Sequence, residues 1–241
     1  MNGIVVQVLL AAVPAVGAIL LHELAHGWAA LALGDDTARA AGRLSLKPWR
    51  HVDRVGTLLV PGVLLLGQLA TIGRVEFMFG WAKPVPVAAW RLHVGEYRVA
   101  RRLMMLVALA GPAMNFVLAW LAAVSLHVSS GFAAPWAEVA GTLLQYFILY
   151  NLVLGLFNLL PVPPLDGGRV VVGLLPEALA LRWARLERAG VALVLLCVFV
   201  LPAALRQAGV AFDPVRTLLD HVLPAALSLV LRLAGSPDVG F

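Results

Sequence analysis

The chain has 241 residues, of which 61% are hydrophobic and 13% are charged. A soluble domain of this size carries about 25% charged residues, so this sequence has too little polar surface to cover a water-soluble globule. Its net charge of +5 comes from basic residues that lie between apolar runs, a pattern that orients membrane proteins and does not indicate nucleic-acid binding. The composition predicts an integral helical membrane protein.

Six apolar runs follow one another along the chain. They cover residues 4–33, 55–72, 103–128, 139–160, 189–205 and 215–233. A helix needs about 20 apolar residues to cross a bilayer, and the second run is interrupted by Pro61, Gly62 and Gly67. We therefore expect an all-α membrane bundle of about five spanning helices with a re-entrant segment at 55–73. A full crossing by residues 55–73 stays open as the alternative.

The loop sequence Gly-Trp-Ala-Lys-Pro-Val-Pro-Val at residues 80–87 predicts an extended or β element. Its two prolines lack backbone donors and favour extended geometry in the residues before them. Such a segment can only be an edge, and an edge can hold an unwound substrate by β-addition. We name Trp81, Lys83 and Pro84 as candidate substrate-binding residues. In the alternative, the segment is an interfacial loop anchored by Trp81 and Lys83.

The first apolar run contains the sequence His-Glu-Leu-Ala-His at residues 22–26. Residues four apart share one face of a helix, so His22 and His26 can bind one metal ion. Glu23 is placed to act as the general base toward water at that metal. Ionisable groups inside a membrane helix are costly and usually functional. A buried polar cluster without metal is the alternative.

Two histidines leave a catalytic zinc site one protein ligand short. Asp166 follows the fourth apolar run and precedes Gly167 and Gly168, which permit a tight turn there. We predict Asp166 as the third ligand, with water at the fourth position. In the alternative reading, Asp166 caps a helix that begins near Gly168.

Asparagines in the apolar runs need hydrogen-bonding partners. Asn151 and Asn158 are seven residues apart and share a helix face. Asn158 either binds the substrate backbone or bonds a neighbouring helix, and both readings stay open. For Asn151 and Asn115 we favour bonds between helices. The histidines outside the motif, at positions 51, 93, 127 and 221, are expected at the membrane interface.

The motifs HELAHG, AGPAMN and NLLPVPPLDGG, in this order, resemble the site-2 protease family of intramembrane zinc metalloproteases. GWAKPVPV and GRLSLKPWRHVDRVGT resemble its compact bacterial and archaeal branch, which lacks PDZ and CBS domains. The resemblance covers residues 22–169 and implies that zinc is bound by His22, His26 and Asp166, with Glu23 as the general base. It also implies roles for Asn158 and for the Gly-Pro-x-x-Asn motif at residues 111–115.

The distribution of charge tests this metal site. Residues 34–54, 74–102 and 161–188 are rich in arginine, whereas residues 129–138 contain neither Lys nor Arg. The positive-inside rule places the three basic loops in the cytoplasm. His26 and Asp166 can share a metal only if an even number of crossings separates them. The third and fourth runs supply two crossings, so the second run must return to the side from which it entered.

We therefore expect a single membrane-embedded protease domain over residues 1–241, with a catalytic core at 4–170 and accessory helices at 171–235. It would bind one zinc ion per chain and cut membrane-protein substrates from the cytoplasmic side of the plasma membrane. The rival hypothesis is a non-proteolytic metal-binding membrane protein, either a transporter or a protease-like scaffold. The substrate, a regulatory membrane partner and the oligomeric state cannot be read from the sequence.

Overall fold

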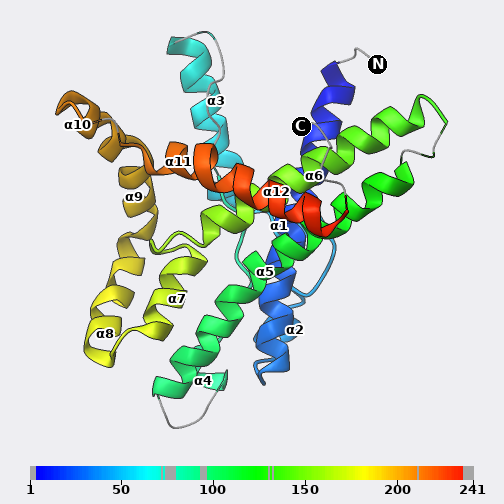
Figure 1. Cartoon of the computed structure of the whole chain (residues 1–241). Helices are drawn as coiled ribbons and strands as arrows, with labels where there is room; N and C mark the ends of the chain where they lie inside the picture. The colour runs from blue at the N-terminus through cyan, green and yellow to red at the C-terminus, as the bar shows by residue number, and fades with distance from the viewer. Residues whose placement is uncertain are drawn as a thin grey trace.

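The computed structural model describes residues 4–71, 73, 80–92, 97–129, 131, 133–210 and 212–235. These residues form helices joined by loops, and no strand is assigned among them (Figure 1). The all-α prediction is confirmed to this extent. The N-terminal half contains α1 (Ile4–Ala32), α2 (Thr37–Ala40), η1 (Pro48–Arg50), η2 (Arg54–Leu59), α3 (Val60–Thr71), α4 (Ala89–Leu92) and α5 (Tyr97–Ser129).

The C-terminal half begins with the long helix α6 (Trp136–Asn158) and continues in shorter pieces. These are α7 (Asp166–Leu174), α8 (Glu177–Arg185), η3 (Leu186–Ala189), α9 (Gly190–Leu195), η4 (Leu196–Val200), α10 (Leu201–Gln207), α11 (Pro214–Thr217), η5 (Leu218–Val222) and α12 (Leu223–Leu233).

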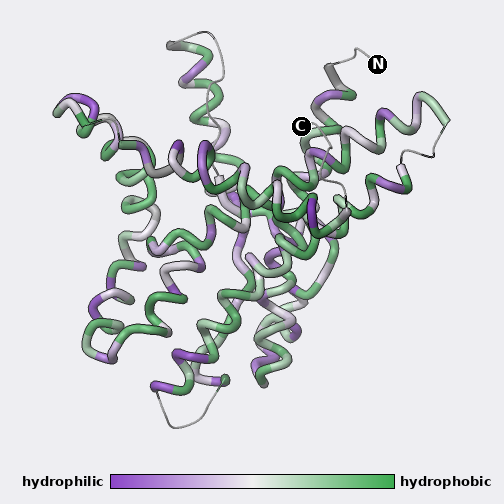
Figure 2. The backbone as a smooth tube through the Cα atoms, in the orientation of Figure 1, coloured by the Kyte–Doolittle hydropathy of each residue, from purple (hydrophilic) through white to green (hydrophobic). Residues whose placement is uncertain are grey.

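Three helices in the described part of the chain are long and apolar enough to cross a membrane. They cover Leu9–Ala32 in α1, Arg98–Ser129 in α5 and Trp136–Asn158 in α6. Hydrophobic residues run along most of their length (Figure 2). The fifth and sixth apolar runs are divided among α9 to α12. The expectation of about five spanning helices therefore stays a prediction.

Helices α5 and α6 pack closely through small residues. Ala119, Ala122 and Ala123 of α5 are buried against Ile148 and Leu152 of α6, and α12 completes this cluster. Apolar side chains gain nothing by leaving lipid for another helix, so small residues that let backbones approach are favoured at such contacts. This packing holds α5 and α6 together beside α1.

Both ends of the segment that contains α3 lie at the same end of α1. The backbone N–H of Ala88 donates to Oδ2 of Asp35 (2.6 Å), and Arg91 forms an ion pair with Asp36. Figure 1 shows α2 and α4 at the lower end of the molecule and α3 pointing away from them. Burial alone would raise the pKa of Asp35, but hydrogen bonds from Thr37 and Ala88 outweigh it and hold this pKa below its ordinary value.

Residues 80–88 form an irregular segment with an alternating pattern of backbone hydrogen bonds. The N–H groups of Trp81, Lys83 and Val85 bond Gly56 O (3.1 Å), His51 O (2.8 Å) and Glu23 Oε2 (2.9 Å). A period of two is that of an extended chain. The extended geometry agrees with expectation. The described residues contain no β-strand there, because these partners are single groups from η2, from a loop and from a side chain, and they do not form a second strand.

Candidate active site

Three side chains from two helices converge on one point. His22 and His26 project from α1, and Asp166 is the first residue of α7. The two Nε2 atoms lie 3.1 Å apart, and each lies 3.2 Å from Oδ2 of Asp166. His22 and Asp166 are buried, at 4% and 7% exposure. These are the three ligands predicted from the sequence, and their ligand atoms are close enough to hold one metal ion.

The partners of the two imidazoles identify which nitrogen carries the proton. Nδ1 of His22 lies 2.6 Å from the amide oxygen of Asn115, and Nδ1 of His26 lies 2.8 Å from the carbonyl of Val107. Both partners only accept, so both Nδ1 atoms must be protonated donors. In neutral imidazoles, both Nε2 atoms then carry lone pairs. Two lone pairs and a carboxylate oxygen face one another with no hydrogen to share.

Such a cluster of electron-pair donors is the arrangement that a cation stabilises. Bonds of 2.0–2.1 Å to a tetrahedral zinc ion place neighbouring ligand atoms about 3.3 Å apart. The observed separations of 3.1–3.2 Å are close to this value. Oδ2 of Asp166 is buried and has no hydrogen-bond donor. The residues present therefore fit zinc, with two nitrogen ligands, one oxygen ligand and room in the coordination sphere for water.

Gly111 allows α5 to pass directly over the two imidazoles. A Cβ atom at this position would lie 2.4 Å from Nε2 of His26 and 2.6 Å from Cε1 of His22. No side chain fits at these distances without moving the rings. The Gly-Pro-x-x-Asn motif therefore contributes twice to the site, through the missing side chain of Gly111 and through the amide of Asn115.

The amide of Asn115 belongs to a buried chain of hydrogen bonds. Its Nδ2 donates to Oδ1 of Asn151 (2.8 Å), and Nδ2 of Asn151 donates to the carbonyl of Phe147 (2.8 Å). Asn115 and Asn151 are both fully buried. The expectation that they bond neighbouring helices is correct for Asn151. For Asn115 it is incomplete, because Asn115 also orients a metal-ligand candidate, a contact over 93 residues that no local pattern indicates.

Asp166 is positioned by a turn that folds closely on itself. A Cβ atom on Gly167 would lie 2.3 Å from the carbonyl oxygens of Leu159 and Leu160. A side chain at position 167 would overlap these carbonyl oxygens, so close packing requires glycine here. From the sequence, we had expected glycine for the backbone flexibility of a tight turn. Asp166 opens α7 as its first helical residue and Leu165 holds the cap position, so the capping alternative is wrong.

Glu23 lies beside the three converging residues and is half-buried. Its Oε2 accepts the hydrogen bond from Val85 N–H, so the extended segment is attached to the proposed base. Further contacts hold this segment in place: Thr57 Oγ1 donates to Trp81 O (2.8 Å), and the buried Arg43 donates to Lys83 O (2.6 Å).

The remaining predicted residues lie in different environments. Trp81 is half-buried, whereas Lys83 and Pro84 are exposed. Asn158 is half-buried and donates to the carbonyl of Leu154 (3.0 Å) in its own helix. Their substrate-binding roles stay predictions.

The other histidines are not gathered with the site residues. His51 was expected at the interface but is 95% buried (5% exposed), and its Nε2 bonds the carbonyl of Ser45 (3.0 Å). His127 and His221 are exposed, and His93 lies outside the described residues.

Two imidazoles, a carboxylate and an adjacent glutamate in a helical membrane protein are the groups that a metallohydrolase centre requires. Comparison with known proteins agrees. The model of peptidase family M50 matches residues 10–141 and 127–201. The "Putative zinc metalloprotease YwhC" of Bacillus subtilis is 37% identical over 186 residues, which is 76% of each chain.

The similarity to two further relatives covers a smaller part of those proteins. Rip2 of Mycobacterium tuberculosis, which carries the same descriptive name, is 37% identical over 62% of this chain and 51% of its own. Rip3 of the same organism is 31% identical over 66% of this chain and 29% of its own. No solved structure matches the chain significantly. The chain belongs to peptidase family M50, the intramembrane zinc metalloproteases of the site-2 protease type.

Proposed function

We propose that this intramembrane zinc metalloprotease cuts its substrates at the centre formed by His22, His26 and Asp166, with one zinc ion per chain. The observation that carries the proposal is the convergence of two imidazole lone pairs and an unpartnered carboxylate oxygen at 3.1–3.2 Å. When bound, zinc polarises the scissile carbonyl and makes the attacking water more acidic. Glu23 would take the proton from this water and deliver it to the leaving nitrogen.

The alternative is a metal-binding membrane protein without proteolytic activity. The placement of Glu23 favours the protease, because a pure binding site needs no base beside its ligands. Glu23 is not one of the three converging residues, and its carboxylate is oriented by Val85 N–H. A base that is held next to the metal and does not bind it is the arrangement that hydrolysis requires.

The substitution Glu23→Gln tests this function directly. The variant is expected to keep bound zinc, measured by elemental analysis of the purified protein, and to lose proteolysis of a membrane-protein substrate. His22→Ala and Asp166→Ala should instead lower the zinc content. Substantial cleavage by Glu23→Gln would contradict the mechanism, and full zinc in Asp166→Ala would remove Asp166 from the ligands.

We further propose that residues 80–87 hold the substrate. The contacts of the described residues engage the N–H groups of Trp81, Lys83 and Val85, so these groups point toward the protein. By alternation, Ala82 and Pro86 face the other way. That outer edge offers carbonyl acceptors to the N–H groups of an unwound substrate strand. Replacement of residues 81–87 by a Gly/Ser linker should abolish cleavage, and normal cleavage would exclude this role.

The proposed location is the plasma membrane, with the active site toward the cytoplasm. The contacts of Asp35 with Ala88 and of Asp36 with Arg91 support a segment 55–73 that returns to the side from which it entered. The arginine-rich loops then share one side of the membrane, in agreement with the positive-inside rule.

A further inference from the structure

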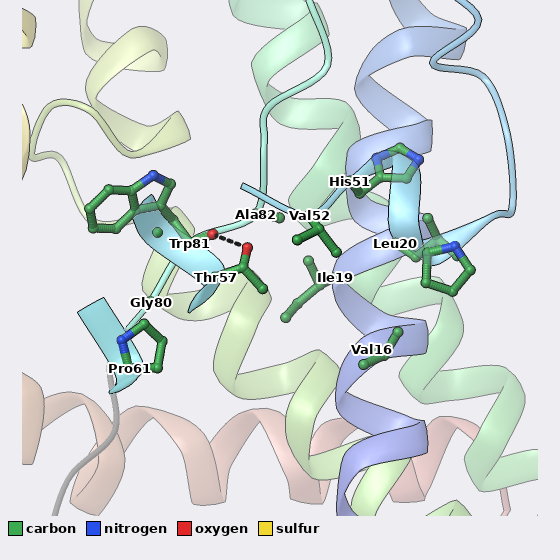
Figure 3. Close-up of a pocket in the computed structure, with 12 residues that line it drawn as sticks. Val16, Ile19, Leu20, His51, Val52, Thr57, Pro61, Gly80, Trp81 and Ala82 are labelled. Atoms are coloured by element: carbon green, nitrogen blue, oxygen red, sulfur yellow. Dashed lines mark hydrogen bonds between the residues drawn. The ribbon is translucent and has the colours of Figure 1, made fainter. Parts of the chain in front are cut away.

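A cavity of about 350 Å³ lies between α1 and the chain on either side of α3 (Figure 3). One wall is the α1 face with Val16, Ile19 and Leu20. The opposite wall comes from the loop around η2 and from the start of the extended segment. It is formed by Pro48, His51, Val52, Gly56, Thr57, Pro61, Gly80, Trp81 and Ala82.

The walls of this cavity lead to the proposed base. Ile19 is four residues before Glu23 on α1, which is one turn, or about 6 Å along the axis. At 100° per residue, Ile19 projects between the directions of His22 and Glu23. On the other side, Ala82 is three residues before Val85, whose N–H bonds Glu23. Both walls of the cavity therefore belong to chain segments that run on to Glu23.

The lining is suited to an apolar occupant. Aliphatic residues, glycines and prolines make up most of the lining. The hydroxyl of Thr57 already bonds the carbonyl of Trp81. The indole of Trp81 packs against Gly56, where a Cβ atom would approach the ring to 2.3 Å, so Trp81 is held in place beside the cavity. A volume in this range accepts a large aliphatic or aromatic side chain.

We propose that this cavity is a specificity pocket that receives a large apolar side chain of the substrate next to the scissile bond. The inference rests on the proposed function, which supplies the substrate class: residues of membrane-spanning segments are mostly apolar. A side chain that enters here would bring the adjoining carbonyl toward Glu23, because Ile19 in the pocket wall lies one helical turn from that residue. A lipid acyl chain is the competing occupant.

A series of hydroxamates tests the pocket without a known substrate. The compounds carry the same zinc-binding group and differ only in one side chain: methyl, isobutyl or naphthylmethyl. Their dissociation constants are measured by calorimetry on the zinc-loaded protein in lipid nanodiscs. Each buried methylene strengthens binding by a factor of about four, so isobutyl should bind roughly tenfold or more tightly than methyl.

Two variants fill the pocket from opposite walls. Ile19→Trp and Val52→Trp are expected to abolish the gain in affinity that the large side chains give over methyl. Val13→Trp is the matched control, because Val13 is an exposed residue of α1 outside the pocket. This control should behave as the wild type.

The outcomes separate the pocket from the function on which it rests. If no hydroxamate binds the wild-type protein, the proposed zinc site fails. If all three bind the wild type equally, or if the gain persists in both filled variants, the zinc site stands and the pocket proposal is overturned. Equal binding is also the result expected when lipid occupies the cavity.

Discussion

Asn115 accepts a hydrogen bond from the imidazole of His22 across the interface of α1 and α5, at 2.6 Å. The direction of this bond is determined at the far end of the hydrogen-bond chain, where Asn151 meets the carbonyl of Phe147. The carbonyl of Phe147 only accepts, so the amide nitrogen of Asn151 must face it and the amide oxygen must face Asn115. Asn115 is oriented in turn, and His22 must present its Nδ1 proton. Its Nε2 lone pair is then directed to the proposed metal position between His22, His26 and Asp166.

Substitutions at Asn151 test this chain of hydrogen bonds. Asn151→Leu keeps the branched shape of the side chain but removes both bonds, and loss of outer partners of a metal ligand typically weakens metal binding by about 10- to 100-fold. We expect zinc affinity to fall by about tenfold, the lower end of this range, because Asn151 acts on His22 only through Asn115. Competition with a zinc chelator measures the affinity.

Asn151→Ser provides the matched rescue for the same experiment. A hydroxyl can donate to the Phe147 carbonyl and accept from Asn115, as Ser125 already donates to Leu121 four residues before it (2.8 Å). Asn151→Ser should therefore recover part of the affinity that Asn151→Leu loses. Equal zinc affinity in the wild type and Asn151→Leu would show that Asn151 only packs.

Gly111→Ala should remove most of the bound zinc. Its Cβ atom would overlap Nε2 of His26 at 2.4 Å, and the ring can only escape by leaving the metal. Gly141→Ala in α6 is the control, because a Cβ atom there meets nothing within 4 Å. That change should leave zinc unaffected and stabilise the helix by up to about 1 kcal/mol. Normal zinc content in Gly111→Ala would mean that the two helices separate easily.

Much of this centre is visible in the sequence, for a physical reason. The spacing of His22 and His26 is a local helical property, and Asp166 stands out because it ends an apolar run. The family resemblance pointed to Gly111 and Asn115 as members of a motif, but their contacts with the imidazoles form only when α1 and α5 meet. Hydropathy does not encode which faces of these helices meet. The extended segment was expected from its prolines, but its attachment to Glu23 was not, because a backbone N–H has no sequence signature.

Val85→Pro should reduce cleavage without lowering zinc content. The substitution removes the N–H that bonds Glu23, and the extended chain between Pro84 and Pro86 tolerates another proline. A hydrogen bond to a charged group contributes about 1.5–3 kcal/mol, so kcat/KM should fall roughly tenfold or more if this bond orients the base. Val85→Ala retains the N–H and serves as the control. Equal activity of the two variants would show that the bond is incidental.

The last prediction concerns the path of the chain through the membrane. Trp49 and Trp90 are exposed residues on either side of the α3 segment, and Trp136 is an exposed residue at the start of α6. Because Asp35 and Asp36 contact Ala88 and Arg91, the chain before and after α3 should face the same compartment. The positive-inside rule makes this compartment the cytoplasm and places Trp136 outside.

Cysteine labelling in cells measures this arrangement. The one native cysteine, Cys197, is first replaced by serine, and single cysteines are then introduced by Trp49→Cys, Trp90→Cys and Trp136→Cys. A thiol reagent that cannot cross the membrane should label the third variant in intact cells, and the first two only after the membrane is opened. Labelling of Trp49→Cys and Trp90→Cys from opposite sides would mean that residues 55–73 cross the bilayer completely. Asp166 and the histidines could then not share a metal without a further crossing, so this result would contradict the proposed site together with the topology.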